Sequence, residues 1–251
     1  MDQSFVDQLE LGLSADISGW GFAWLEGHAT EERPPWGYAN LMGQRMATAS
    51  ASLDLQTGGG EVLASVPTVP LVAAATEGYP PNVAKASEIL LPKGILVVAD
   101  SDEPPLPFAD GTFDLVTSRH PATIWWSEIA RVLAPGGTYL AQHVGPASAF
   151  ELIEYFLGPQ PEARKGRHPD TEVAAARAAG LEVVDLQTAT LRIELFDVAA
   201  AVYLLRKVIW WVPGFTVEQY RDRLWDLHQQ IQTDGVFVAH STRHLIEAKR
   251  Q

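Results

Sequence analysis

Short apolar segments alternate with helix-like segments between residues 51 and 144. The apolar segments cover residues 52–56, 71–75, 95–99, 113–118 and 138–144. The segments 61–66, 81–90 and 124–133 lie between them and have the length, spacing and start signals of helices. Short buried strands joined through helices predict a parallel sheet with right-handed crossovers.

The pattern after Gly145 also predicts helices and strands, in a less regular order. Helices are expected over 147–157, 171–179 and 198–209 and from residue 216, and strands over 181–196 and 236–248. We see no internal repeat. We therefore expect one domain over residues 49–251.

The first 48 residues have a different character, because aromatic side chains alternate there with glycine and proline. Five aromatic residues lie between positions 20 and 38: Trp20, Phe22, Trp24, Trp36 and Tyr38. Long helices are not expected in this segment except near its start. Exposed tryptophans are costly unless they cover something, so we expect residues 1–48 to form a cap or a lid.

Composition narrows the class of protein. Of 251 residues, 47% are apolar and 20% charged, which is typical of a globular domain. The absence of cysteine excludes disulfides, thiolate metal sites and a cysteine nucleophile. There is no signal-peptide pattern and no apolar run long enough for a membrane span, so we expect a cytoplasmic protein without a membrane partner.

The formal net charge of −13 favours a small-molecule substrate over nucleic acid. Proteins that bind nucleic acid usually present a basic face. The modest basic cluster at residues 164–168 is interpreted as a solvated loop. The sequence gives no indication of the oligomeric state.

The segment from Asp54 to Glu61 is the most informative for binding, because it places Gly58, Gly59 and Gly60 between a strand and a helix. Glycines at such a turn let the backbone approach a ligand closely. Glu77 follows Asp54 by 23 positions, where the second strand should end. An acid at that place can accept hydrogen bonds from both hydroxyls of a ribose.

Two further segments carry a family resemblance. Residues 102–116 (DEPPLPFADGTFDLV) and 128–140 (EIARVLAPGGTYL) resemble, in the correct order, the regions around the fourth and fifth strands of class I S-adenosylmethionine-dependent methyltransferases. The resemblance covers about residues 50–145. It implies a doubly wound, mainly parallel α/β sheet of seven strands, with the last strand antiparallel. It also implies methyl transfer from S-adenosylmethionine to a small organic acceptor.

The same resemblance assigns roles to individual residues. Asp54 and the glycines from Gly58 to Gly60 would surround the methionine end of the cofactor, and Glu77 would hold the ribose. Asp102 and Glu103 would lie at the adenine. Ser118 would lie at the mouth facing the methyl group.

One residue departs from the family. Gln56 stands where the family usually has glycine. Its side-chain amide would either bond the methionine portion of the cofactor or weaken cofactor binding, because a Cβ restricts the turn.

Methyl transfer from a sulfonium needs mainly alignment, and it needs a base only when the acceptor must lose a proton early. His120 and His143 lie at or just beyond predicted strand ends and are the candidate bases. A structural role is the alternative for each. His240 and His244 are four apart on a predicted strand and would not converge, so no metal site is expected.

Three other functions compete with this hypothesis. A non-catalytic relative that binds a ligand is motivated by Gln56. An RNA methyltransferase is disfavoured by the net negative charge of the chain. A nicotinamide-dependent dehydrogenase is disfavoured because the segments within residues 102–116 and 128–140 have no role in nicotinamide binding.

The acceptor is expected between the ends of the strands 113–118 and 138–144 and the segment after Gly145.

Overall fold

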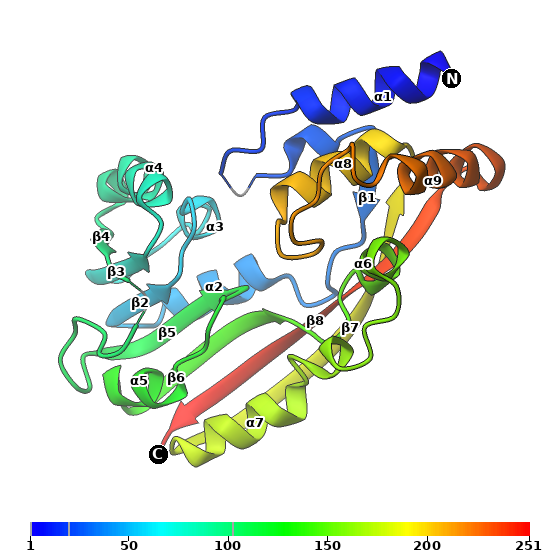
Figure 1. The fold of residues 1–251 in the computed structure, drawn as a ribbon. Helices are drawn as coiled ribbons and strands as arrows, with labels where there is room; N and C mark the ends of the chain where they lie inside the picture. The colour runs from blue at the N-terminus through cyan, green and yellow to red at the C-terminus, as the bar shows by residue number, and fades with distance from the viewer. Residues whose placement is uncertain (1, 20, 102) are drawn as a thin grey trace. The chain divides into compact units, whose positions relative to one another are not determined.

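The computed structural model describes residues 2–19, 21–101 and 103–251 and contains one mixed sheet. Its strands are β1 (Ala29–Glu31), β2 (Ala51–Leu55), β3 (Val72–Glu77), β4 (Leu96–Ala99), β5 (Phe113–Arg119), β6 (Leu133–Val144), β7 (Leu181–Leu195) and β8 (Phe237–Arg250). They lie in the order β1-β7-β8-β6-β5-β2-β3-β4 (Figure 1). The pairs among β2 to β6 are parallel, while β8 joins β6 antiparallel, as predicted.

Helices occupy most of the remaining chain. They are α1 (Gln3–Ser14), α2 (Tyr38–Met46), α3 (Glu61–Ala64), α4 (Pro80–Leu90), α5 (Trp126–Val132), α6 (Phe150–Leu157), α7 (Pro169–Ala178), α8 (Val198–Lys207) and α9 (Arg221–Asp234). Single 3₁₀ turns lie at Ala23–Leu25, Leu91–Lys93 and Ala163–Lys165.

The chain forms two compact units. One comprises residues 34–145, 167–189 and 243–251, and the other residues 1–33, 146–166 and 190–242. The first contains the predicted βαβ region and is called the sheet unit below; the second is called the helical unit. The strands β7 and β8 contribute residues to both.

The sheet unit has a hydrophobic core on each face of its parallel strands. Adjacent residues of one strand enter opposite cores, because side chains alternate across a strand. On β5, Leu115 packs in the core with α2, α3 and α4, and Val116 in the core with α5 and α7. Both side chains are buried. This is the doubly wound arrangement that the sequence predicted.

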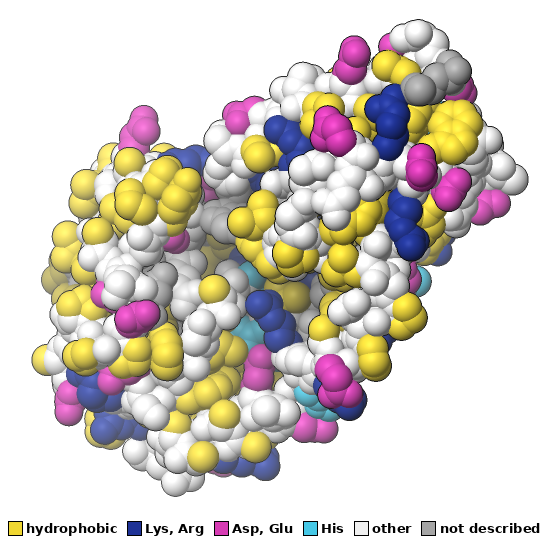
Figure 2. All heavy atoms as spheres, in the orientation of Figure 1, with side chains coloured by type: hydrophobic (Ala, Val, Ile, Leu, Met, Phe, Trp, Pro, Cys, Tyr) yellow, Lys and Arg dark blue, Asp and Glu magenta, His cyan; other side chains and the backbone are white. Residues whose placement is uncertain are grey.

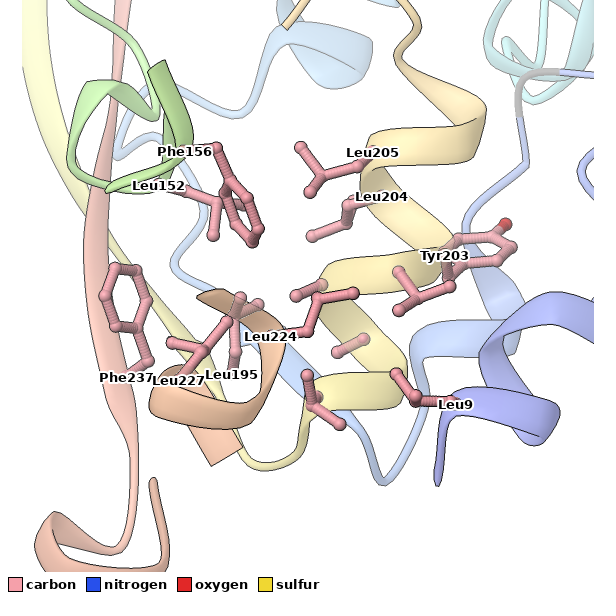
Figure 3. Close-up of a cluster of buried hydrophobic side chains, with 14 of the residues drawn as sticks. Leu9, Leu152, Phe156, Leu195, Tyr203, Leu204, Leu205, Leu224, Leu227 and Phe237 are labelled. Atoms are coloured by element: carbon pink, nitrogen blue, oxygen red, sulfur yellow. The ribbon is translucent and has the colours of Figure 1, made fainter. Parts of the chain in front are cut away.

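The helical unit is built around α8, which is buried on nearly every side. Its side chains pack against Phe5 and Leu9 of α1, Phe156 of α6 and Leu224 of α9 (Figure 3). Gly12 allows α1 to approach α8 closely, since a Cβ there would lie 2.8 Å from the Ala199 carbonyl oxygen.

Two elements differ from expectation. The sheet has an eighth strand, β1, whose three residues pair with the end of β7. The order of apolar and polar side chains does not predict this pairing, because it rests on the backbone. The helix α2 lies in the segment expected to lack long helices; Met42 and Met46 bury it in the core of the sheet unit. Trp20 lies outside the described residues, and the lid role of residues 1–48 stays a prediction.

Candidate cofactor and acceptor site

The loop between β2 and α3 takes the conformation that its glycines predict. Gly58 and Gly60 have φ of +65° and +80°, a region that glycine enters freely. A Cβ on Gly60 would lie 2.9 Å from a methyl carbon of Leu90 on α4. The loop therefore packs closely on α4, with Gly60 buried against that helix.

Glu77, the last residue of β3, holds this loop. One carboxylate oxygen accepts a hydrogen bond from the Gly58 amide at 2.7 Å, and the other accepts one from the Tyr79 amide at 2.9 Å. The side chain is largely buried. The structure thus brings together Glu77 and the glycine loop, which the sequence predicted to share a site.

Asp54 lies at the end of β2 with its carboxylate buried beneath the loop. The Thr117 hydroxyl donates to it at 2.6 Å. Burial raises the pKa of Asp54 from 3.8 to about 6, and the bond from Thr117 opposes part of that rise. A cation beside this carboxylate would stabilise its charged form.

Two polar side chains near the strand ends, which the sequence did not single out, have buried atoms that a bound ligand could contact. Within the part of the chain that the structure describes, a buried carboxylate oxygen of Asp100 and the buried amide nitrogen of Asn82 have no hydrogen-bond partner. Asp100 directly follows β4, and its amide donates to the Glu77 carbonyl. The position of Asp100 directly after an apolar strand could have identified it from the sequence.

The sequence predicted Asp102 and Glu103 to lie at the adenine, and this assignment stays a prediction. Glu103 is exposed on the loop after β4. Asp102 lies outside the described residues. A buried polar group without a partner is rare, so Asp100 is a better-supported contact than Glu103.

Gln56 has φ of +54°, the left-handed conformation that a glycine would take without strain. Its side-chain carbonyl accepts from the Ala122 amide at 2.7 Å, and its amide donates to the Thr123 carbonyl at 2.8 Å. Gln56 therefore ties the loop after β2 to the loop after β5. We call this pair of bonds the Gln56 latch.

The residues after β5 are fixed by neighbouring strands. The Ser118 hydroxyl donates to the Leu55 carbonyl at 2.9 Å. The Gln142 side chain accepts from the Trp36 indole, so its amide donates to His120 Nε2 at 2.8 Å. Burial holds the pKa of His120 well below its usual range, and the charge of Arg119 lowers it further. His120 is therefore neutral at physiological pH, with its proton on Nδ1.

His143, near the end of β6, is bonded through both ring nitrogens. Nδ1 lies 2.5 Å from a carboxylate oxygen of Glu172, and Nε2 lies 3.0 Å from the Tyr139 hydroxyl. Burial lowers the pKa of His143, while the bond to Glu172 raises it. Both ring nitrogens of His143 and Nε2 of His120 are thus engaged in hydrogen bonds, and a base role for either residue stays a prediction.

A cavity of about 300 Å³ lies beside His143. Its walls come from three parts of the sheet unit: the loop 121–124 with Trp126, the end of β6, and the start of α7. The residues of the last group are Arg167, Thr171, Glu172 and Ala175. This is the place where the sequence predicted the acceptor.

A second, much smaller space of about 10 Å³ is lined in part by the same loop. Pro121, Thr123 and Ile124 line both spaces, and Gln56 and Ser118 line the smaller one. The latched loop thus contributes to the walls of both spaces.

The charge on the surface is dispersed. On the face drawn in Figure 2, Lys and Arg side chains are scattered among acidic and apolar ones and form no continuous patch. The helices of the described chain are too short or too polar to cross a lipid bilayer.

Comparisons with known proteins agree with this geometry. Residues 53–141 match a family described as a methyltransferase domain. This stretch begins within β2, ends within β6 and contains most of the site. Over these residues the chain is similar to a methyltransferase domain, and together with the fold this supports a class I S-adenosylmethionine-dependent methyltransferase. No curated protein sequence matches the chain.

Solved structures share the fold. A candidate methyltransferase from Bacillus halodurans superposes with a TM-score of 0.60 at 22% identity, over 85% of this chain and 98% of the other. A candidate sarcosine dimethylglycine methyltransferase from Galdieria sulphuraria gives 0.51 at 16%, over 100% and 99%. The [4+2]-cyclase SpnF gives 0.52 at 16%, over 94% and 85%. At these identities the likeness establishes the fold alone.

Proposed function

We propose that the protein transfers the methyl group of S-adenosylmethionine to a small organic acceptor bound in the 300 Å³ cavity. The observation that carries this proposal is the meeting of Asp54, the glycine loop and Glu77 at the carboxyl ends of β2 and β3. Ligands of open α/β sheets bind at this edge.

The residues at the edge fit the cofactor chemically. The buried Asp54 carboxylate suits the ammonium of the methionine end, because a nearby cation offsets the burial that raises its pKa. Glu77 suits the ribose diol. The unpartnered atoms of Asp100 and Asn82 supply an acceptor and a donor for the nucleoside.

When bound, the cofactor supplies an electrophilic methyl group on a sulfonium, and the protein aligns the acceptor and excludes water. Trp126 and Ile124 give the cavity an apolar wall, while Arg167 gives it a cation. These walls favour an acceptor that combines an apolar body with an acidic group. The Gln56 latch positions the loop that both the cofactor edge and this cavity share.

Calorimetry with S-adenosylmethionine and S-adenosylhomocysteine tests the cofactor assignment. Glu77→Ala should weaken binding by about 1–3 kcal/mol, the cost of losing buried charge-assisted hydrogen bonds. Glu77→Gln keeps one side-chain acceptor for the loop amides. It therefore shows the effect of removing the charge while the loop is still held. The exposed Glu88→Ala on α4 is the matched control and should bind like the wild type. Unchanged affinity in Glu77→Ala would remove Glu77 from the ribose site.

A second function is favoured by the Gln56 latch alone. If the latched loop never opens, the domain is a binding protein with this fold and transfers no methyl group. The absence of binding at millimolar cofactor, in both the wild type and Gln56→Gly, would favour this second function over the enzyme.

A further inference from the structure

Two buried histidines lie side by side on one face of the sheet in the sheet unit. His143 on β6 and His244 on β8 are direct register partners. Partners in an antiparallel pair place their side chains on the same face of the sheet. The two ring centroids lie 5.1 Å apart, and the side chains are 2% and 1% exposed.

Glu172 completes this cluster from the first turn of α7. One of its carboxylate oxygens lies 2.5 Å from His143 Nδ1 and 2.6 Å from His244 Nε2. The three possible ligand atoms all lie within 4.8 Å of one another. Two strands and a helix, rather than mobile loops, therefore hold two imidazole nitrogens and a carboxylate oxygen around a single point.

This set of atoms matches a known ligand preference. Imidazole nitrogen together with carboxylate oxygen suits divalent transition-metal ions such as Zn²⁺. A dipositive ion would also neutralise the charge of the partly buried Glu172 carboxylate.

The surroundings of the cluster resemble those of a metal site that remains open to a ligand. The second nitrogen of His143 is bonded to the Tyr139 hydroxyl, and such outer contacts fix the orientation of a ligating histidine. Among the described residues, His244 Nδ1 has no partner and can carry the proton that Nε2 gives up on binding an ion. Glu172 and His143 also line the 300 Å³ cavity, so an ion would have one side open to it.

We propose that His143, Glu172 and His244 bind one divalent transition-metal ion in the wall of this cavity. The ion is held through His143 Nδ1, His244 Nε2 and the Glu172 carboxylate, and its free position accepts an oxygen or nitrogen donor from the molecule in the cavity. The ion thereby replaces His143 as the group that acts on the acceptor. The proposal does not depend on methyl transfer, since it concerns ion binding by the free protein.

The alternative arrangement is a permanent hydrogen-bonded bridge in which Glu172 accepts from both histidines and no ion enters. The two arrangements differ in an observable that cofactor binding does not affect. A metal site binds one equivalent of ion through these three residues, and a bridge binds none.

Titration of chelator-treated full-length protein with Zn²⁺ and with Co²⁺ tests the proposal. Calorimetry gives the stoichiometry, and the visible absorption of bound Co²⁺ reports nitrogen and oxygen ligation. We expect one equivalent of either ion and a higher unfolding temperature with Zn²⁺. Glu172→Gln, which keeps the size of the side chain, and His244→Gln should each weaken binding by more than about 100-fold, beyond the usual effect of an outer contact.

Two further variants act as comparisons. Tyr139→Phe should weaken binding roughly 10–100-fold, because it removes only the outer bond to His143. His240→Ala should bind like the wild type, since His240 bonds Glu151 in the helical unit. Circular dichroism checks that each variant is folded.

The titration of the wild-type protein is the first test of the proposed metal site. Absence of a stoichiometric ion in the wild type would overturn the proposal, whatever the variants do. Equal binding by the wild type, Glu172→Gln and His244→Gln would also overturn it, because the ion would then lie elsewhere. Loss of the ion in these variants but not in His240→Ala would support it.

Discussion

Gln56 holds a backbone conformation that its neighbours Gly58 and Gly60 adopt without cost. An L-residue at positive φ is strained by about 1 kcal/mol relative to glycine. The two bonds of its side chain to Ala122 and Thr123 offset this strain. The residue that departs from the family pattern is thus held by interactions that a glycine could not make.

Substitution of Gln56 separates these two contributions. Gln56→Ala keeps the strain and loses both bonds, so the free energy of unfolding should fall by about 1–2 kcal/mol. Gln56→Gly loses the bonds and relieves the strain, so its loss should be smaller by about 1 kcal/mol. Urea denaturation measures both. Equal losses in the two variants would mean that the positive φ stores no strain.

The Gln56 latch also changes the expectation for cofactor affinity. Because the amide already bonds the loop after β5, it is not free for the methionine portion in this arrangement. Gln56→Gly should therefore bind S-adenosylmethionine as tightly as the wild type or more tightly. A fall in affinity equivalent to about 0.5–1.5 kcal/mol would instead identify the amide as a ligand.

The buried carboxylate of Asp54 predicts a dependence of stability on pH. Its pKa is about 6 in the folded protein against an ordinary 3.8, so the folded state holds the proton more tightly than the unfolded state. The stability that this group contributes is full below pH 3.8, falls as the pH rises toward 6, and stays low above it. The total loss is about 3 kcal/mol at 1.36 kcal/mol per pH unit.

Asp54→Asn tests this assignment. The variant cannot ionise, so its stability relative to the wild type should rise between pH 4 and 6. Thermal unfolding across that range, with both proteins in the same buffers, gives the difference. A constant difference between the two proteins would show that Asp54 titrates normally in the folded state.

The sequence identified some site residues and missed others for a physical reason. Asp54, Gly58 and Glu77 follow strands in the order of a known family, so spacing alone brings them to one edge. Glu172 joins His143 only because α7 packs on the sheet next to β8. Nothing in the spacing of the chain encodes that meeting.

At the level of elements, Arg131 links α5 to the loop after β4. Its guanidinium donates to the Leu106 and Phe108 carbonyls and pairs with Glu128 and Asp110. The bond to Glu128, followed by that to Asp110, raises the pKa of Arg131 further above its already high value. One side chain of a helix thus holds three points of a loop at the cofactor edge.

Arg131→Lys should release that loop, because an ammonium cannot reproduce the planar fork. We expect faster hydrogen exchange over residues 104–110 and a destabilisation of about 1–3 kcal/mol. Exchange in β2 and β3 serves as the internal control and should change little. Identical exchange over 104–110 would mean that the loop is held by its own packing.

The close packing of α1 on α8 predicts the effect of a substitution at Gly12. A Cβ at Gly12 would lie 2.8 Å from both the Ala199 carbonyl oxygen and Val202 Cβ. Gly12→Ala should therefore destabilise the protein by about 1–3 kcal/mol through overpacking.

Gly43 on α2 provides a matched control for that substitution. The nearest atom to a Cβ there is Pro67 Cδ at 3.6 Å, an ordinary contact. Gly43→Ala should raise the free energy of unfolding by up to about 1 kcal/mol, because alanine favours the helix. Changes of the same sign at both sites would contradict the packing explanation.

Most elements could be predicted from the sequence, and the exceptions are informative. The strands β2 to β6 and the antiparallel β8 follow from apolar runs and from the family resemblance. β1 could not be predicted, because three residues are too few for a periodic signal. α2 was hidden by the prolines and glycine of residues 34–37 just before it and by Gly43 within it, and its stability comes from burial of Met42 and Met46.

For the whole molecule, the residues proposed to bind the cofactor all belong to the sheet unit. A ligand that binds only the native form should protect first the amides that it contacts. We expect S-adenosylhomocysteine to slow hydrogen exchange over residues 54–61 and 77–82. Exchange in α9 of the helical unit should change far less. Equal protection in both units would mean that the cofactor stabilises the chain globally.

The contact between α1 and α8 also bears on how the protein is made. Phe5 and Leu9 leave the ribosome long before the residues of α8 that bury them, which begin at Val198. During most of translation the apolar side of the first helix has no native partner. Contacts so distant in the chain form late, and the exposed surface invites aggregation in the meantime. We therefore expect slower translation before α8 to lower the soluble yield, and Leu9→Glu to lower it for a different reason, by preventing the late docking itself.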